Sequence, residues 1–204
     1  MAAKELAMRY RIPLMHAAFD LQSRLYNICR QRFLQRFSTD TTPAPEREYA
    51  IDNTLYLIGQ YLCFSEIIRR GMLFVSDRRQ DRGFAEAMER VRDWFATTET
   101  EDRTLCLFRG EQRAVGEVML VESDKLFPGD PRWDCLGYAT FVKSLQDPDV
   151  ERWFGSLRQS LETLTSDLEH HDQRLKELQH ALLDLLTLLD PNHEHLPKGL
   201  RQPL

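Results

Sequence analysis

The alternation of hydrophobic and polar positions predicts helices along most of this chain, because apolar residues recur at spacings of three and four. A first helix is expected over residues 14–37 and a second over 46–75, with Pro45 just before the second. The second segment is apolar on more than one side, which is typical of a helix in the middle of a bundle. A third helix should end near Ala96, with Ser76 and Asp77 as candidate caps.

The most regular pattern is a heptad repeat of apolar residues between residues 150 and 189, which ends just before Pro191. It predicts one long C-terminal helix, although Ser166-x-x-Glu169 also fits a capping box that would divide this helix. The earlier half keeps charged flanks, so we expect part of the repeat to form an interface. The candidate interface residues are Leu157, Leu161, Leu164, Leu168 and His171.

Two segments are harder to interpret. Residues 105–108 could form a short strand or continue into a helix that contains two glycines. Residues 122–134 contain two prolines, a glycine and several acids, which indicates a loop. A short helix should follow over 136–145. The expected fold is thus an all-α bundle in a single domain over residues 1–191, followed by a flexible polar tail over 192–204.

Composition and charge limit the classes of function. The net charge is −5, and it is unevenly distributed. Residues 1–92 carry 15 Lys/Arg against 11 Asp/Glu, whereas residues 93–204 carry 12 against 21. The two parts could face each other, or the arginine-rich part could face an acidic partner. Because the total is acidic and no reading motif is present, nucleic acid is not expected as a partner.

The sequence predicts a cytoplasmic location. It has no signal-like apolar run at its start and no stretch near the ~20 apolar residues of a membrane helix. Its four cysteines are far apart and form no C-x-x-C pair, so buried free thiols are expected. No cofactor and no metal site is indicated, because Glu177-x-x-His180 supplies only half of a di-iron carboxylate motif.

Polar residues within two very apolar segments are the candidate ligand-binding residues. They are Glu66, Arg109, Glu111, Gln112, Arg113 and Glu117. Since buried charge must be paired, Arg109 or Arg113 is expected to pair with Glu66 inside the bundle. The alternative is a small pocket in which an arginine binds an anion. No activated nucleophile, phosphate-binding loop or dinucleotide fingerprint is visible, so a catalytic role is less favoured.

Three runs carry a resemblance to known proteins. They are NTLYLIGQYLCFSEIIRR (53–70), LFRGEQRAVGEVM (107–119) and LQHALLDLLTLLDP (178–191). The runs resemble a family of uncharacterised helical proteins in bacteria, and with the intervening helices the resemblance covers most of the chain. It implies a helical fold, and it implies no activity, cofactor or catalytic residues.

The first functional hypothesis is a non-enzymatic interaction, assembly or regulatory protein that self-associates or docks a helical partner through residues 150–178. A second is a bundle that binds or converts a small polar or anionic ligand with Glu66 and segment 109–117. A third, less favoured, is attachment to a membrane surface through the basic first part. The second requires Glu66 and segment 109–117 to converge on a cavity that solvent reaches.

Overall fold

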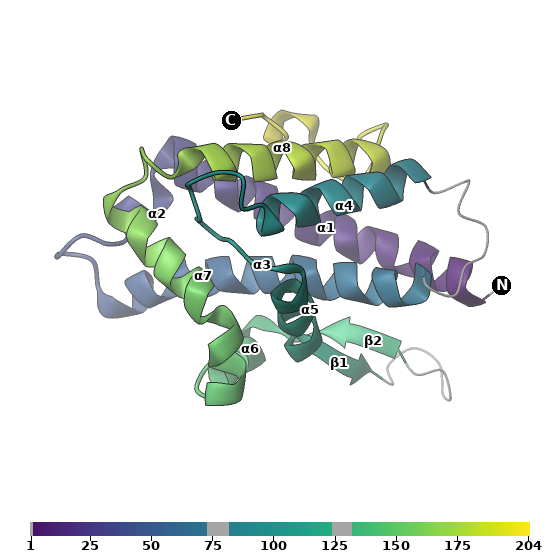
Figure 1. Ribbon diagram of the computed structural model, residues 1–204, viewed down its shortest axis with the longest axis horizontal. Helices are drawn as coiled ribbons and strands as arrows, with labels where there is room; N and C mark the ends of the chain where they lie inside the picture. Colours follow the sequence, from purple (N-terminus) through teal and green to yellow (C-terminus); the bar gives the residue numbers. More distant parts are fainter. Residues whose placement is uncertain (1, 73–81, 124–131) are drawn as a thin grey trace.

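The computed structural model describes residues 2–72, 82–123 and 132–204, and it is mostly helical. Figure 1 shows the helices packed as a bundle with a small two-stranded hairpin at one side. The elements in the described ranges are α1 (Ala2–Gln31), α2 (Phe33–Arg36), α3 (Ala44–Met72), α4 (Arg82–Ala96), α5 (Arg109–Val118), β1 (Leu120–Ser123), β2 (Arg132–Cys135), α6 (Tyr138–Ser144), α7 (Pro148–Ser166), α8 (Asp172–Leu189) and a 3₁₀ turn (Lys198–Leu200).

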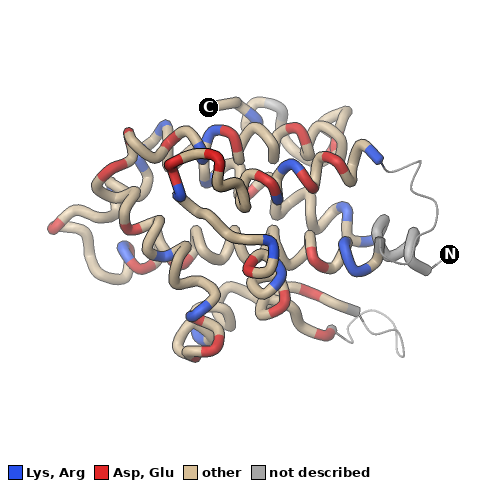
Figure 2. The backbone as a smooth tube through the Cα atoms, viewed as in Figure 1, with Lys and Arg blue, Asp and Glu red and all other residues tan. Residues whose placement is uncertain are grey.

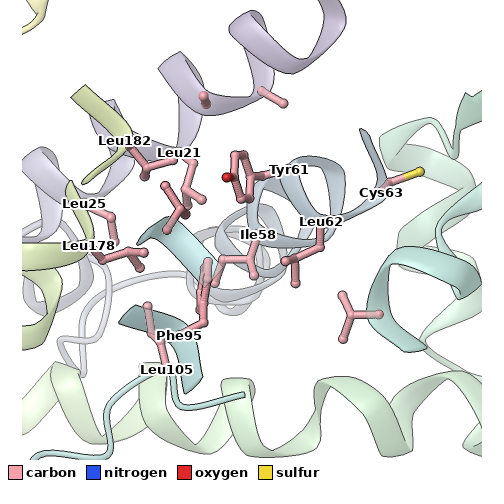
Figure 3. Packing of buried hydrophobic residues seen from close by; sticks show 14 of the residues in the cluster. Leu21, Leu25, Ile58, Tyr61, Leu62, Cys63, Phe95, Leu105, Leu178 and Leu182 are labelled. Atoms are coloured by element: carbon pink, nitrogen blue, oxygen red, sulfur yellow. The ribbon is translucent and has the colours of Figure 1, made fainter. Parts of the chain in front are cut away.

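Helices from several parts of the chain surround the main core. Helix α1 packs against α3 and α8, α4 packs against α8, and α5 packs against α3. Figure 3 shows the centre of this core, where Leu21 and Leu25 of α1 approach Ile58 of α3 and Leu178 and Leu182 of α8. These five side chains are almost completely buried. Segment 46–75 was predicted to lie in the middle of the bundle. Helix α3, which covers its described part, contacts α1, α5, α6, α7 and β2, so its apolar sides face several neighbours.

The first two predicted helices are present with different ends. Helix α1 begins well before residue 14, and the predicted helix 14–37 is divided at Arg32, whose φ of 52° places it in the left-handed region. Helix α3 begins at Ala44, so Pro45 lies in its first turn, where its missing N–H leaves no bond unmade. The predicted caps of the third helix, Ser76 and Asp77, lie outside the described residues.

The prediction of one long C-terminal helix is wrong. The chain forms α7 and α8, with residues 167–171 between them, close to the position of the alternative break. The side chains of Thr163, Thr165 and Ser166 donate hydrogen bonds to carbonyls three or four residues earlier, which competes with continued helix. Asp167 then leaves the helical region, with φ −138° and ψ 64°.

The two helices face different neighbours, and Figure 1 shows α7 running obliquely across the bundle. Helix α7 packs against α2, α3 and α5, while α8 packs against α1 and α4. The predicted interface residues Leu157, Leu161, Leu164 and Leu168 are all buried in the core. The heptad repeat therefore supplies core contacts of this chain to two separate sets of helices.

The structure settles the alternatives left open for residues 105–108, and it changes the prediction for residues 122–134. Residues 105–108 form no strand, and Leu105 has a φ of 53°. In contrast, both described ends of the predicted loop 122–134 belong to an antiparallel hairpin, in which Leu120 pairs with Cys135. Two strands of four residues give little periodicity, so composition alone could not indicate them.

The C-terminal segment, predicted as a flexible tail, lies against α1 and α8. The Arg201 guanidinium forms an ion pair with the buried Asp190 carboxylate at the end of α8. Gln179 donates to the carbonyl of Gln202 (2.8 Å), and Leu196 is buried. Polar composition did not reveal these contacts because they depend on side chains far away in the sequence.

Figure 2 shows acidic and basic residues mixed along the described helices. Arg69 and Arg70 lie in the last turn of α3, and Arg82 is the first residue of α4. Within the described ranges, no helix combines the length and the apolar character that crossing a membrane requires.

Candidate ligand-binding site

A close contact between α5 and α3 positions the candidate site. Gly116 of α5 lies directly on the backbone of α3, where a Cβ atom at this position would be 2.7 Å from the carbonyl oxygen of Leu62. Only glycine permits this approach, since any side chain would force the two helices apart. One turn earlier on the same face, Gln112 consequently comes to the α3 surface beside Glu66.

A small pocket lies where α3, α4 and α5 meet, and we call it the Glu66 pocket. Its lining consists of Leu62, Ser65, Glu66, Arg69, Arg92, Gln112 and Arg113. The hollow is partly open to solvent, and the space within it that can hold the centre of a water molecule is only about 10 Å³. This space accommodates roughly one water molecule or one oxygen atom of a ligand. Three of the lining residues are arginines and one is a glutamate, and Glu89 outside the lining pairs with Arg92.

Glu66 is buried and bound by two arginines of its own helix. Arg69 donates to both carboxylate oxygens, from Nε (2.7 Å) and Nη2 (2.6 Å), and Arg70 donates from Nε (2.8 Å). Burial raises the pKa of the Glu66 carboxyl, but the hydrogen bonds and charges of the two arginines outweigh it and leave the pKa below its usual value. Glu66 is therefore ionised at neutral pH, and the charges of Arg69 and Arg70 balance its negative charge.

Gln112 forms the buried wall of the Glu66 pocket and is only 2% exposed. Its amide nitrogen donates to the carbonyl oxygens of Arg92 and Leu107, both at 2.9 Å. These two bonds fix the orientation of the amide, because the opposite orientation would place an oxygen against two carbonyls. Its Oε1 atom is buried and has no hydrogen-bond partner among the described residues.

The arginines differ in how freely they can bind a ligand. Arg69 is held by Glu66, and Arg92 donates to Glu89 (2.6 Å) from a largely buried side chain. Arg113 is exposed at the mouth of the pocket and forms no ion pair within the described part of the chain. Guanidinium groups have hydrogens to donate and no lone pair to offer, so this mouth favours acceptor groups of a ligand.

The structure brings together three of the six predicted ligand-binding residues, namely Glu66, Gln112 and Arg113. The expected pairing of Glu66 with Arg109 or Arg113 is not observed. Arg109 instead faces α4 and pairs with Glu89 (3.0 Å) and Asp93, because α5 presents that side to α4.

The remaining predicted residues have other contacts. Glu111 accepts a hydrogen bond from the backbone N–H of Phe108 (2.7 Å), which satisfies a free donor at the start of α5. Glu117 is exposed and accepts from Arg70 (2.7 Å), so it is joined to the Glu66 cluster from outside the pocket. His171 precedes α8, and its Nδ1 lies 3.3 Å from a carboxylate oxygen of Asp102.

Sequence reasoning did not assign Ser65, Arg69 and Arg92 to this site. Arg69 lies three residues after Glu66, a spacing that favours a helical ion pair and could have indicated their contact. Arg92 comes from another helix, and no local pattern places it near α3. No group of three His, Cys, Asp or Glu side chains that could hold a metal ion occurs in the part of the chain described here.

Comparisons with models of protein families, with curated proteins and with solved structures found no match to this chain. The resemblance of its three runs to a family of bacterial helical proteins stays a prediction.

Proposed function

We propose that the protein is a non-enzymatic binding protein that takes a small anionic ligand in the Glu66 pocket. The observation that carries the proposal is the convergence of Glu66, Gln112 and Arg113 from α3 and α5 on a hollow open to solvent. Arg113 supplies a cation at the pocket that forms no ion pair with any residue in the described ranges, whereas Arg69 and Arg92 are already paired with Glu66 and Glu89. An anion would be attracted to this lining and could accept hydrogen bonds from the guanidinium groups.

The chemistry of the lining favours binding over catalysis. Neither histidine nor cysteine is among the residues that line the Glu66 pocket. Its carboxylate, Glu66, accepts three hydrogen bonds from arginines and has a lowered pKa, which makes it a weak general base. The one hydroxyl, on Ser65, has no histidine among the other lining residues to activate it.

The other two hypotheses have less support. Docking through the heptad repeat would need exposed leucines, but Leu157, Leu161 and Leu164 are fully buried in the core. Membrane attachment would need free basic residues, but Arg69 and Arg70 are engaged by carboxylates. Neither hypothesis accounts for a buried polar lining at the junction of three helices.

The experiment is a titration of the purified protein by isothermal calorimetry with inorganic phosphate, sulfate and acetate in turn, at low ionic strength. We expect at least one anion to bind, and Arg113→Gln to weaken it about tenfold or more, since a hydrogen bond to a charged group contributes roughly 1.5–3 kcal/mol. The matched control is Arg36→Gln, which removes the same charge from an exposed arginine on α2. Absence of binding by all three anions, or an equal loss in both variants, would refute the proposal.

A further inference from the structure

Two of the four cysteines lie close together where the hairpin packs on α3. We infer that Cys63 of α3 and Cys135 of β2 form a disulfide when a peroxide oxidises the protein, and that a thiol reductant reverses it. Both residues are free thiols in this structure. The disulfide would join α3 covalently to the hairpin, and this redox-sensitive site is independent of the proposed anion binding.

The side chain of Cys63 faces the hairpin. Figure 3 shows its sulfur atom pointing away from the other labelled core residues, and β2 is among the elements that contact α3. The Cys63 Sγ lies 4.0 Å from the carbonyl oxygen of Asp134. That carbonyl group is bonded to the backbone nitrogen of Cys135, and the Cys135 side chain is within hydrogen-bonding reach of the Cys63 thiol. The two cysteines are therefore neighbours across the contact between α3 and β2.

Bond formation requires the two sulfur atoms to approach to about 2.05 Å. The peptide group between Asp134 and Cys135 already lies beside the Cys63 sulfur. Cys135 is the last residue of β2, so the movements needed are a rotation of its side chain and a small shift of the strand end.

The two thiols differ in how easily an oxidant reaches them. Cys63 is completely buried, whereas Cys135 is partly exposed. The hydrogen bond with Cys135 and burial both raise the pKa of the Cys63 thiol. Because the thiolate is the reactive form, Cys63 is protected from direct oxidation. Cys135 is therefore the residue that meets the oxidant, and Cys63 is the partner that completes the bridge.

The reaction proceeds in two steps, with hydrogen peroxide as the oxidant. In the first step the Cys135 sulfur attacks one peroxide oxygen, the O–O bond breaks, and a sulfenic acid and one water molecule form. In the second step the Cys63 sulfur attacks the Cys135 sulfur, the S–S bond forms and the S–O bond breaks. The hydroxyl group leaves with the Cys63 proton as a second water molecule, so two thiols and one peroxide yield one disulfide and two waters.

The first measurement is mass spectrometry of tryptic peptides from the folded natural chain, treated with hydrogen peroxide and then with an alkylating agent. Cys63 lies in peptide 48–69 and Cys135 in peptide 133–143. We expect these peptides to be joined with the loss of two hydrogen atoms and to separate after reduction with dithiothreitol. Since the bridge closes a long loop, the thermal midpoint of the oxidised protein should rise by about 5 °C or more.

Two variants identify the residues responsible. Cys135→Ser should form no joined peptides and show no thermal shift on oxidation. The matched control is Cys106→Ser, which removes another partly buried thiol and should leave the bridge and its rate unchanged. If Cys135→Ser does not fold, the peptides of the natural chain decide the question alone.

Three outcomes overturn the inference. The first is oxidation that stops at a sulfenic or sulfinic acid on Cys135, or that leaves both thiols intact. The second is a disulfide that forms only between two copies of the chain. The third is pairing of Cys63 with Cys29 or Cys106 as often as with Cys135, because that result would show reaction from an unfolded state.

Discussion

Arg174 is a buried cation of α8, and its replacement by methionine is expected to destabilise the protein strongly. The side chain is 2% exposed, and its guanidinium group connects α8 with the end of α4 and the segment that follows. It donates to the carbonyl oxygens of Trp94 (3.1 Å), Phe95 (3.4 Å), Thr97 (2.5 Å) and Asp102 (3.1 Å). Its charge also lies at the C-terminal end of α4, where a cation is favourable.

The structure allows a rough magnitude for this loss. Methionine has an unbranched side chain of similar length to the aliphatic part of arginine. The main loss is therefore the guanidinium N–H groups that donate to the four carbonyl oxygens. At about 1 kcal/mol for each carbonyl left without a donor, the free energy of unfolding should fall by about 4 kcal/mol. This value lies within the roughly 3–5 kcal/mol observed when a buried charged contact is broken. With a urea dependence of about 2.5 kcal/mol per molar, the midpoint should fall by about 1.6 M.

The measurement is urea unfolding followed by circular dichroism. The control is Arg90→Met on α4, because Arg90 is 57% exposed and its Nη1 is 3.8 Å from Asp184. That exposed contact should contribute no more than about 1 kcal/mol. Arg174→Lys keeps the charge but has fewer donors, so it should lie between the natural chain and Arg174→Met, and it carries the comparison if the methionine variant does not fold. An Arg174→Met variant no less stable than the Arg90 control would refute the reasoning.

Two further predictions concern the candidate site. Gly116→Ala should lower the free energy of unfolding by about 1–3 kcal/mol, because its methyl group would collide with the Leu62 carbonyl. Gly155→Ala is the control and should raise it by roughly 0.5–1 kcal/mol, since nothing lies within 4 Å and alanine favours helix. Equal thermal midpoints for the two variants would contradict this. The pKa of Glu66 is lower in the folded protein than its value of about 4.5 in the unfolded chain, so the ionised carboxylate stabilises the fold. This stabilisation is complete above pH about 4.5 and disappears as the pH falls through the folded pKa. The stability difference between the natural chain and Glu66→Gln, measured by urea unfolding from about pH 7 to about pH 3, should therefore close at the acidic end; a difference independent of pH would show that the charge is not responsible.

About half of the candidate site was predictable from sequence. Glu66 and Gln112 were found because a polar residue in an apolar helical segment must be paired or must line a polar site. Arg113 was found because it lies beside Gln112 in the same segment. Arg92 could not be found in this way, since the pattern of α4 indicates which face is buried and does not indicate which helix covers that face. The same limit explains why Arg109 was expected to pair with Glu66 and pairs with α4 instead.

The sequence by itself determined the helical class of the protein and its apolar faces, including the breadth of the apolar surface of α3. These features follow from spacings of three and four residues, which are local properties of the chain. It also indicated a possible break near Ser166, but the capping box predicted there does not form, because Ser166 ends α7 and α8 is preceded by His171.

Only the tertiary structure decided what each apolar face contacts. A heptad repeat has the same spacing whether its leucines meet another chain or the core of their own, so the repeat could not show that α7 and α8 pack against different helices. The approach of Gly116 to Leu62 and the docking of Arg201 on Asp190 likewise join residues that are distant in sequence. Such contacts depend on the relative placement of whole helices, which short-range periodicity does not specify.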